Sequence, residues 1–112
     1  MKLEEFSQDD FERASRRLVR SLTRGKTTSS QPKAILLGGQ SGAGKTTIHR
    51  IKQREFQGNI IIIDGDSYRS FHPNYLGLQE KYGKDSVDYT KVFAGRMVEY
   101  LVDELSKQGY HL

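Results

Sequence analysis

The chain has 112 residues, with 18 Lys and Arg against 14 Asp and Glu, and it contains no Cys. The lack of Cys excludes a disulfide framework and a cysteine-ligated metal site. The acidic N-terminus does not resemble a secretory signal, and no segment is apolar enough to predict a membrane span, so we expect a cytoplasmic protein. Hydrophobic residues make up only 35% of the chain, which suggests either a marginal domain or part of a larger one.

The first predicted element is an amphipathic helix over residues 8–23. Ser7 is its expected N-cap, and acidic residues in the first turn suit the positive end of a helix dipole. Apolar residues then recur at helical spacing, at Phe11, Ala14, Leu18, Val19 and Leu22. The polar stretch 23–32 ends in Pro and is typical of a linker. We therefore divide the chain into a basic helix and linker at 1–32 and the N-terminal part of a second domain at 33–112.

Residues 13–26 carry six basic side chains and no acidic one. Such a segment can attract a polyanion. No aromatic residue is interleaved with the basic ones as a stacking platform, however, so a solvated helix face is the favoured interpretation. Nucleic acid is therefore not expected as a partner.

From residue 33 onward, strands and helices are expected to alternate. Short apolar runs predict buried strands at 34–37 and 60–63, with a helix over 45–56 between them. Residues 64–85 are expected to form a long aromatic loop with at most one helical turn. Ser86 is then predicted to cap a helix that ends at Gly109, and its apolar stripe is Phe93, Ala94, Met97, Val98, Leu101 and Leu105.

Residues 110–112 are expected to begin a third strand. Alternating strands and helices predict an α/β fold, with a parallel sheet that is covered by helices on both faces. Two or three strands are few for such a sheet, so the sheet is expected to be incomplete in this chain.

The most specific motif is G-x-x-x-x-G-K-[ST] between the first strand and the following helix. Its glycines allow backbone N–H groups to surround an anion, and the helix N-terminus adds unpaired donors. Lys45 is expected to contact the β- and γ-phosphates in a catalytic role, and the Thr46 hydroxyl to ligate Mg²⁺. The predicted nucleotide-binding residues are Gly39, Gln40, Ser41, Gly42, Ala43, Gly44, Lys45, Thr46 and Thr47.

Two acids follow the second predicted strand, at Asp64 and Asp66. If the two strands are neighbours in the sheet, Asp66 lies beside the phosphate loop and can accept the proton of an attacking hydroxyl. The alternative is that both acids only terminate the strand and cap the loop. Arg69 can clamp a phosphate or can be an ordinary surface residue, and His72 is expected to be structural. No N-K-x-D signature for GTP is present, which leaves the choice between ATP and GTP open.

Three segments together, at 34–50, 61–75 and 84–110, closely resemble the zeta toxin family, in particular its PezT-like branch. The resemblance implies a P-loop kinase fold that uses ATP or GTP with Mg²⁺ to phosphorylate UDP-N-acetylglucosamine on the sugar 3′-hydroxyl. It also implies a cognate antitoxin of the epsilon or PezA type as partner. By position, Asp66 matches the family's proposed base, and Glu99 matches an acid that hydrogen-bonds the sugar.

The helical wheel alone places Glu99 opposite the apolar stripe, where simple solvent exposure is the expectation. Family members also continue well beyond Leu112, so we expect this chain to be truncated. Two alternatives stay open. The chain can belong to a kinase of another small hydroxylated metabolite, or it can be a non-catalytic fragment that only binds an antitoxin.

Overall fold

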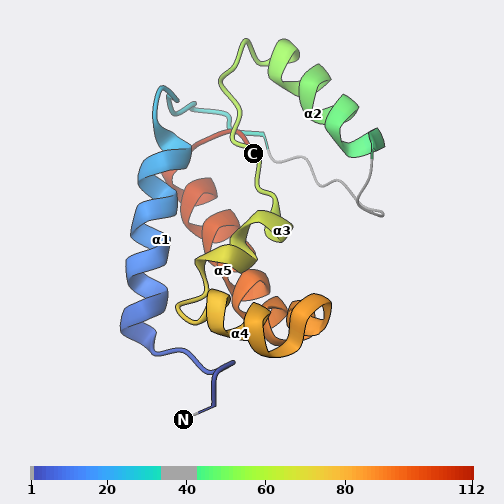
Figure 1. Ribbon diagram of the computed structural model, residues 1–112. Helices are drawn as coiled ribbons and strands as arrows, with labels where there is room; N and C mark the ends of the chain where they lie inside the picture. Colours follow the sequence, from blue (N-terminus) through green and yellow to red (C-terminus); the bar gives the residue numbers. More distant parts are fainter. Residues whose placement is uncertain (1, 34–42) are drawn as a thin grey trace.

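The computed structural model describes residues 2–33 and 43–112, and this part of the chain is mainly helical (Figure 1). Its helices are α1 (Gln8–Thr23), α2 (Ala43–Glu55), α3 (Gly65–Tyr68), α4 (Tyr75–Tyr82) and α5 (Val87–Gln108), with 3-10 turns η1 (Arg69–Phe71) and η2 (Gly83–Ser86). Within these described ranges no strand is formed. No helix there is both long and apolar enough to cross a membrane.

The N-terminal helix agrees with its prediction at both ends. The Ser7 Oγ accepts a hydrogen bond from the Asp10 N–H at 3.0 Å, which satisfies one of the free donors of the first turn. The apolar face of α1 buries Phe11, Ala14 and Leu18 against α5. The segment 1–32 thus packs on the rest of the chain, while the domain boundary after residue 32 stays a prediction.

The longest helix, α5, supplies the centre of the hydrophobic core. Phe93, Met97, Leu101 and Leu105 on its predicted apolar stripe are completely buried. The helix ends at Gly109, whose φ of +95° is the left-handed conformation that favours glycine at a C-cap. Because α1, α3 and η1 all pack on α5, this helix positions the segments that carry the candidate site.

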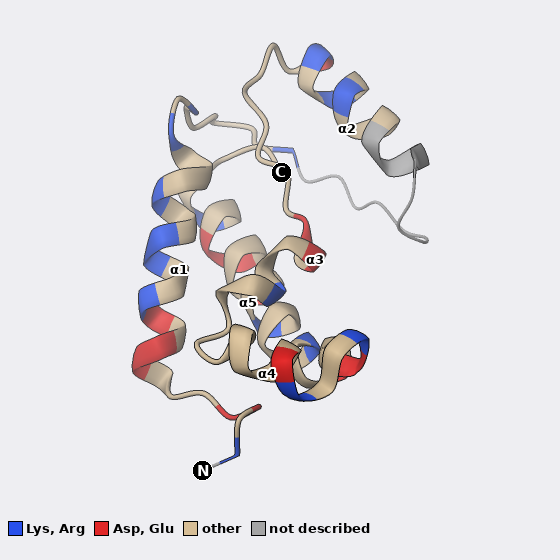
Figure 2. Ribbon diagram, in the orientation of Figure 1, with Lys and Arg blue, Asp and Glu red and all other residues tan. Residues whose placement is uncertain are grey.

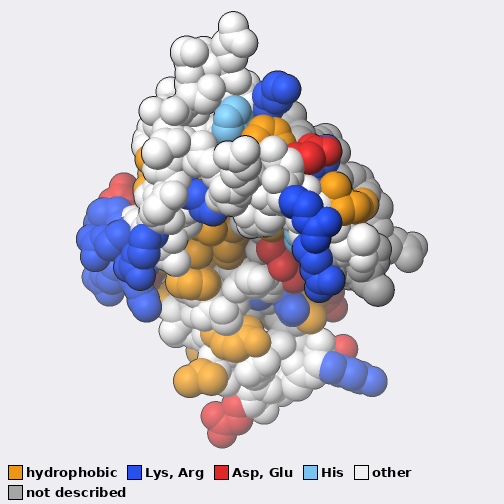
Figure 3. All heavy atoms as spheres, turned by 90° about the horizontal axis from the view of Figure 1, so that it is seen from above, with side chains coloured by type: hydrophobic (Ala, Val, Ile, Leu, Met, Phe, Trp, Pro, Cys, Tyr) orange, Lys and Arg blue, Asp and Glu red, His pale blue; other side chains and the backbone are white. Residues whose placement is uncertain are grey.

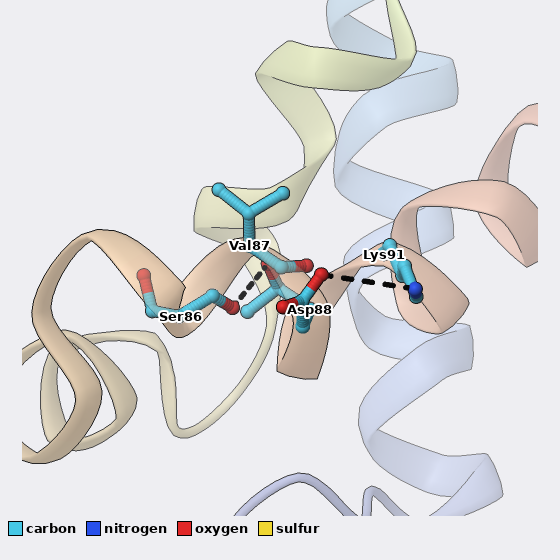
Figure 4. Close-up of polar contacts among 5 residues, drawn as sticks. Ser86, Val87, Asp88 and Lys91 are labelled. Carbon is cyan, nitrogen blue, oxygen red and sulfur yellow. Dashed lines mark hydrogen bonds and ion pairs between the residues drawn. The ribbon is translucent and has the colours of Figure 1, made fainter.

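The prediction that Ser86 caps a helix ending at Gly109 is confirmed in position, because Ser86 is the N-cap residue of α5. Ser86 is buried, and no hydrogen bond from its side chain caps the helix. Its backbone is already helical, because the 3-10 turn η2 leads directly into α5. The Ser86 carbonyl instead accepts from the Thr90 Oγ1 at 3.1 Å, and Asp88 forms an ion pair with Lys91 at 3.8 Å (Figure 4).

The prediction of a long loop over residues 64–85 is wrong. This stretch forms α3, η1, α4 and η2 in succession. Its helices are at most eight residues long, and Gly77 interrupts the side-chain pattern of α4. Such short helices show no clear apolar period in the sequence, and tertiary packing decides their formation, as at the fully buried Leu78.

The two predicted strands have different outcomes. Residues 34–37 lie outside the described residues. Residues 60–63 are not a strand, although Ile60 and Ile61 are buried as expected. A strand requires a continuous ladder of hydrogen bonds, whereas among the described residues this segment forms one such backbone bond, from the Ile61 N–H to the His111 carbonyl at 2.9 Å.

The C-terminal residues lie between Lys33, which precedes the first predicted strand, and Ile61 in the second predicted strand. On one side the His111 carbonyl accepts from Ile61, and on the other the Leu112 N–H donates to the Lys33 carbonyl at 3.0 Å. Residues 110–112 thus separate Lys33 from Ile61, while the first predicted strand, at 34–37, lies outside the described residues. These contacts also place the chain end beside both segments, as expected for a beginning third strand, although no ladder is formed there.

The linker after α1 is fixed to three parts of the molecule. The Ser29 N–H donates to the Gly109 carbonyl at 2.8 Å, and the Ser29 carbonyl approaches so closely that a Cβ on Gly109 would lie 3.1 Å from it. The Thr27 N–H donates to the Asn59 Oδ1 at 2.8 Å, and Lys26 donates to the Gly58 carbonyl. The linker thereby joins α1, the turn after α2 and the end of α5.

Candidate active site

The helix that follows the phosphate-loop motif begins at Ala43, two residues before its predicted start. Residues 39–42, which include four of the predicted nucleotide-binding positions, lie outside the described residues. The backbone of Lys45 and Thr46 belongs to the first turn of α2, which contains no acidic residue. The N–H groups of a first turn have no partner inside the helix, so this helix end suits an anion.

Basic residues continue along α2 as far as its last turn, at Lys52 and Arg54. Lys52 forms an ion pair with Glu55 at 3.0 Å, so this lysine has a local partner on its own helix. In Figure 1, α2 stands apart from α1 and α5, and none of the closely packed pairs of elements includes it. Its C-terminal end is held by Phe56, whose ring centroid lies 4.8 Å from that of His111.

The two acids after residue 63 have different roles. Asp64 is the N-cap of α3: its Oδ1 accepts from the Asp66 N–H at 3.2 Å, and its Oδ2 accepts from the Ser67 hydroxyl at 3.1 Å. Asp66 is exposed, and its carboxylate has no hydrogen-bond or ion-pair partner among the described residues. The capping interpretation therefore holds for Asp64, whereas the Asp66 carboxylate is available to a ligand.

The helix α3 is fixed by a close approach to α5. A Cβ built on Gly65 would lie 3.0 Å from the Val98 Cγ2, so the two helices touch at this point. Asp66 and Glu99 are the next residues on the two helices, and both are exposed. Each of the two acidic positions suggested for the acceptor side thus follows, along its own helix, a residue of this contact. Glu99 has the exposure that the helical wheel predicts.

Two buried polar groups lie directly after Asp66. The Tyr68 hydroxyl and the Arg69 Nε are buried without a hydrogen-bond partner among the described residues. Burial raises the pKa of the Tyr68 hydroxyl, so this group stays protonated and remains a potential donor. Arg69 is half-buried, which differs from the plain surface position considered as its alternative. Sequence reasoning missed Tyr68, because nothing distinguishes it from the other aromatic residues of this stretch.

His72 has the structural role that was expected. It is 3% exposed, its Nδ1 accepts from the Asn74 N–H at 3.0 Å, and its Nε2 lies 2.9 Å from the Glu4 carbonyl. Because Nδ1 is an acceptor, the neutral ring must carry its proton on Nε2 and donate to Glu4. Both ring nitrogens are thus occupied in joining the N-terminal segment to the start of α4, which leaves His72 no part in catalysis.

One cleft in the described part of the surface is separate from the candidate acids. A cleft of about 440 Å³ lies between α1 and η1. It is lined by Asp10, Arg13, Ala14, Arg17, Ser70, Phe71, His72 and Pro73. Asp66, Arg69 and Glu99 are absent from this lining, so the cleft and the acidic positions are separate features of the described surface.

A G-x-x-x-x-G-K-T motif that leads into a helix is typical of the class of phosphate-loop nucleotide-binding proteins. The comparison with protein families specifies this class further. The family model described as "Zeta toxin" matches residues 18–112. The chain therefore belongs to the zeta toxin family, as its sequence resemblance predicted.

Individual relatives agree with this assignment. The chain is 67% identical over all its 112 residues to "Toxin PezT" of Streptococcus pneumoniae, and 38% identical over 108 residues to "Toxin zeta" of Streptococcus agalactiae. It spans 44% and 38% of the length of these two relatives. The chain thus corresponds to less than half of each.

A solved structure is also closely similar. It comes from a characterisation of the PezAT chromosomal toxin–antitoxin system of Streptococcus pneumoniae, and it is 68% identical with a TM-score of 0.96. The match covers 100% of this chain and 45% of that one. The arrangement of helices described above is therefore shared with a member of the PezT branch.

Proposed function

We propose that this chain forms the nucleotide-binding part of a phosphotransferase toxin that is restrained by an antitoxin. The observation that carries the proposal is that α2 begins inside the G-x-x-x-x-G-K-T motif, at Ala43. A phosphate loop requires this placement, because its terminal Lys and Thr must stand in the first turn of the helix whose free N–H groups meet the phosphates.

On the nucleotide side, Lys45 contributes a positive charge at the β- and γ-phosphates of ATP or GTP. Backbone N–H groups of residues 39–44 donate to the same phosphates. Thr46 would hold Mg²⁺ through its hydroxyl, and the ion, when bound, neutralises charge that develops on the transferring group. The acid-free first turn of α2 supports this assignment, since an acid there would repel the triphosphate.

On the acceptor side, Asp66 takes the proton of the attacking hydroxyl. The hydroxyl oxygen then bonds to the γ-phosphorus, and the bond between that phosphorus and the departing nucleoside diphosphate breaks. The exposed, unpartnered Asp66 carboxylate and its placement beside the α5 contact support this role. Glu99 would hydrogen-bond the acceptor, and Arg69 would contact its phosphate groups.

For the acceptor we propose UDP-N-acetylglucosamine, phosphorylated at the sugar 3′-hydroxyl. The support is membership of the zeta toxin family and the match of Asp66 and Glu99 to that family's pattern. For the partner we propose an antitoxin of the epsilon or PezA type, because the similar solved structure belongs to a toxin–antitoxin system. A kinase of another small hydroxylated metabolite is the alternative, and labelled γ-phosphate transfer to a panel of acceptors separates the two.

Nucleotide binding is tested by titrating the chain with ATP and Mg²⁺. Lys45→Ala should weaken binding by about 10- to 150-fold, the usual contribution of a charge-assisted hydrogen bond. Lys52→Ala is the matched control, because it removes the same charge from the same helix at a residue that is paired with Glu55. Equal affinities for the two variants would refute the phosphate-loop assignment.

A further inference from the structure

Helix α1 presents a line of arginines on the side opposite its buried face. At 100° per residue, Arg13, Arg16, Arg17 and Arg20 fall within an arc of about 100°. The buried Phe11, Ala14 and Leu18 lie on the other side of the helix. Arg24, the residue that follows the helix, extends the line, and all five arginines are exposed. We call Arg13, Arg16, Arg17, Arg20 and Arg24 the arginine stripe.

Figure 2 shows these basic residues along α1 beyond its acidic first turn, and Figure 3 shows basic side chains gathered at the same side of the molecule. From Arg13 to Arg24 the stripe extends about 16 Å at the rise of an α-helix. Lys26 is not part of it, because its ammonium group donates to the Gly58 carbonyl. The basic segment found in the sequence is thereby reduced to five arginines that share one face.

The stripe also differs from the other helices in its ion pairs. On α5, Lys91 pairs with Asp88 and Lys107 pairs with Asp103, each one turn apart. On α1, Arg13 alone reaches a carboxylate, that of Asp10 at the limiting distance of 4.0 Å. The other four arginines have no ion-pair partner among the described residues. An ordinary solvated helix face carries acids at this spacing, and residues 13–26 have none.

The chemistry of the stripe favours phosphate over a protein surface. A protein interface has an apolar centre with a polar rim, and it is usually enriched in aromatic residues. The large exposed hydrophobic residues of the described chain all lie outside α1, at Ile48, Ile51, Leu76, Val87, Val92, Tyr100 and Val102. Contacts to a nucleic-acid backbone need no apolar centre, and the arginine fork matches phosphate oxygens bidentately.

The stripe also indicates the form of the nucleic acid. Beside the stripe, the half-buried Phe71 ring lies 6.0 Å from the Arg17 guanidinium, and one such ring does not form the series of stacking platforms that successive unpaired bases need, which disfavours a single strand. The apolar face of α1 is buried against α5, so the helix has no face to insert into a membrane. We propose that the arginine stripe binds the phosphate backbone of double-stranded nucleic acid, independently of base sequence. The unpaired arginines reverse the expectation of a merely solvated face.

The test is the salt dependence of binding to a labelled DNA duplex of about 20 base pairs, with an RNA duplex in parallel. Five phosphate contacts predict a slope of about −4.5 in log affinity against log salt concentration. The affinity for the duplex should therefore fall roughly 500-fold between 50 and 200 mM salt. Arg16→Gln with Arg20→Gln should reduce the slope to about −2.7 and the loss to roughly 40-fold.

The matched control is Lys91→Gln with Lys107→Gln, which removes two charges from α5 and should leave the slope unchanged. Equal slopes for the two double variants, or no duplex binding at about 50 mM salt, would overturn the proposal. Binding to an acidic polypeptide or to anionic vesicles, with no binding to either duplex, would assign the stripe to another partner and would overturn it as well. Nucleotide titration of the same variants shows separately whether the proposed function holds.

Discussion

The contact between Gly65 and Val98 links the stability of the fold to the position of Asp66. A methyl group on residue 65 would lie 3.0 Å from the Val98 Cγ2, well inside ordinary van der Waals distance. Val98 is β-branched and sits in the middle of α5, where one side-chain rotamer is strongly preferred, so it cannot easily turn away. Gly65→Ala should therefore push α3 away from α5 and displace Asp66 with it.

The expected size of this effect follows from two opposing contributions. Overpacking of a filled contact costs about 1–3 kcal/mol. Alanine in place of glycine in a helix gains up to about 1 kcal/mol. Gly65→Ala should therefore lower the free energy of unfolding by about 0–3 kcal/mol. In a Val98→Ala background the clash is absent. There Gly65→Ala should raise the free energy of unfolding by up to about 1 kcal/mol.

The assay is urea unfolding of the four proteins in this double-mutant cycle, followed by far-ultraviolet circular dichroism. The coupling free energy between the two sites should be at least about 1 kcal/mol. The double variant should be more stable than the added effects of the two single substitutions predict. An equal change in the free energy of unfolding for Gly65→Ala in both backgrounds would show that α3 and α5 do not touch at this point. Asp66 would then not be held beside α5.

Three further predictions concern the acceptor side, the histidine link and α2. Asp66→Asn, in the longest chain that the gene encodes, should slow phosphoryl transfer by about 10²–10⁴-fold with unchanged ATP affinity; weaker ATP binding at unchanged turnover would move Asp66 to the nucleotide. His72→Phe should lower the free energy of unfolding by about 1–3 kcal/mol, because the Glu4 carbonyl and the Asn74 N–H lose their partner; an unchanged urea midpoint would contradict this. ATP with Mg²⁺ should slow tryptic cleavage after Arg54 in α2, as followed by mass spectrometry, and equal protection of a Lys45→Ala variant would contradict nucleotide binding at this helix.

The long helices could be predicted because their apolar residues repeat over several turns. Phe11, Ala14 and Leu18 define one face of α1, and Phe93 to Leu105 do so for α5. The short helices could not be predicted in this way. In α4, Leu78 is buried, but eight residues that include Gly77 and the exposed Leu76 give too few repeats to establish a period.

The isoleucine run at 60–63 shows the limit of β propensity. Propensity for strands mainly reports a side chain's fit to a buried surface, and the burial of Ile60 and Ile61 was predicted correctly. A strand also needs a partner segment, and the partner of Ile61 is His111, fifty positions further along the chain. Local sequence carries no information on such a distant pairing.

The residues of the candidate site also differ in how far local sequence predicts them. The phosphate-loop motif is local, so the sequence alone located Lys45 at the start of a helix. Glu99 has no local signal, since an acid on the exposed side of α5 resembles any solvated residue, and only the family resemblance singled it out. The unpartnered Tyr68 hydroxyl depends on what surrounds it in three dimensions, which periodicity does not report.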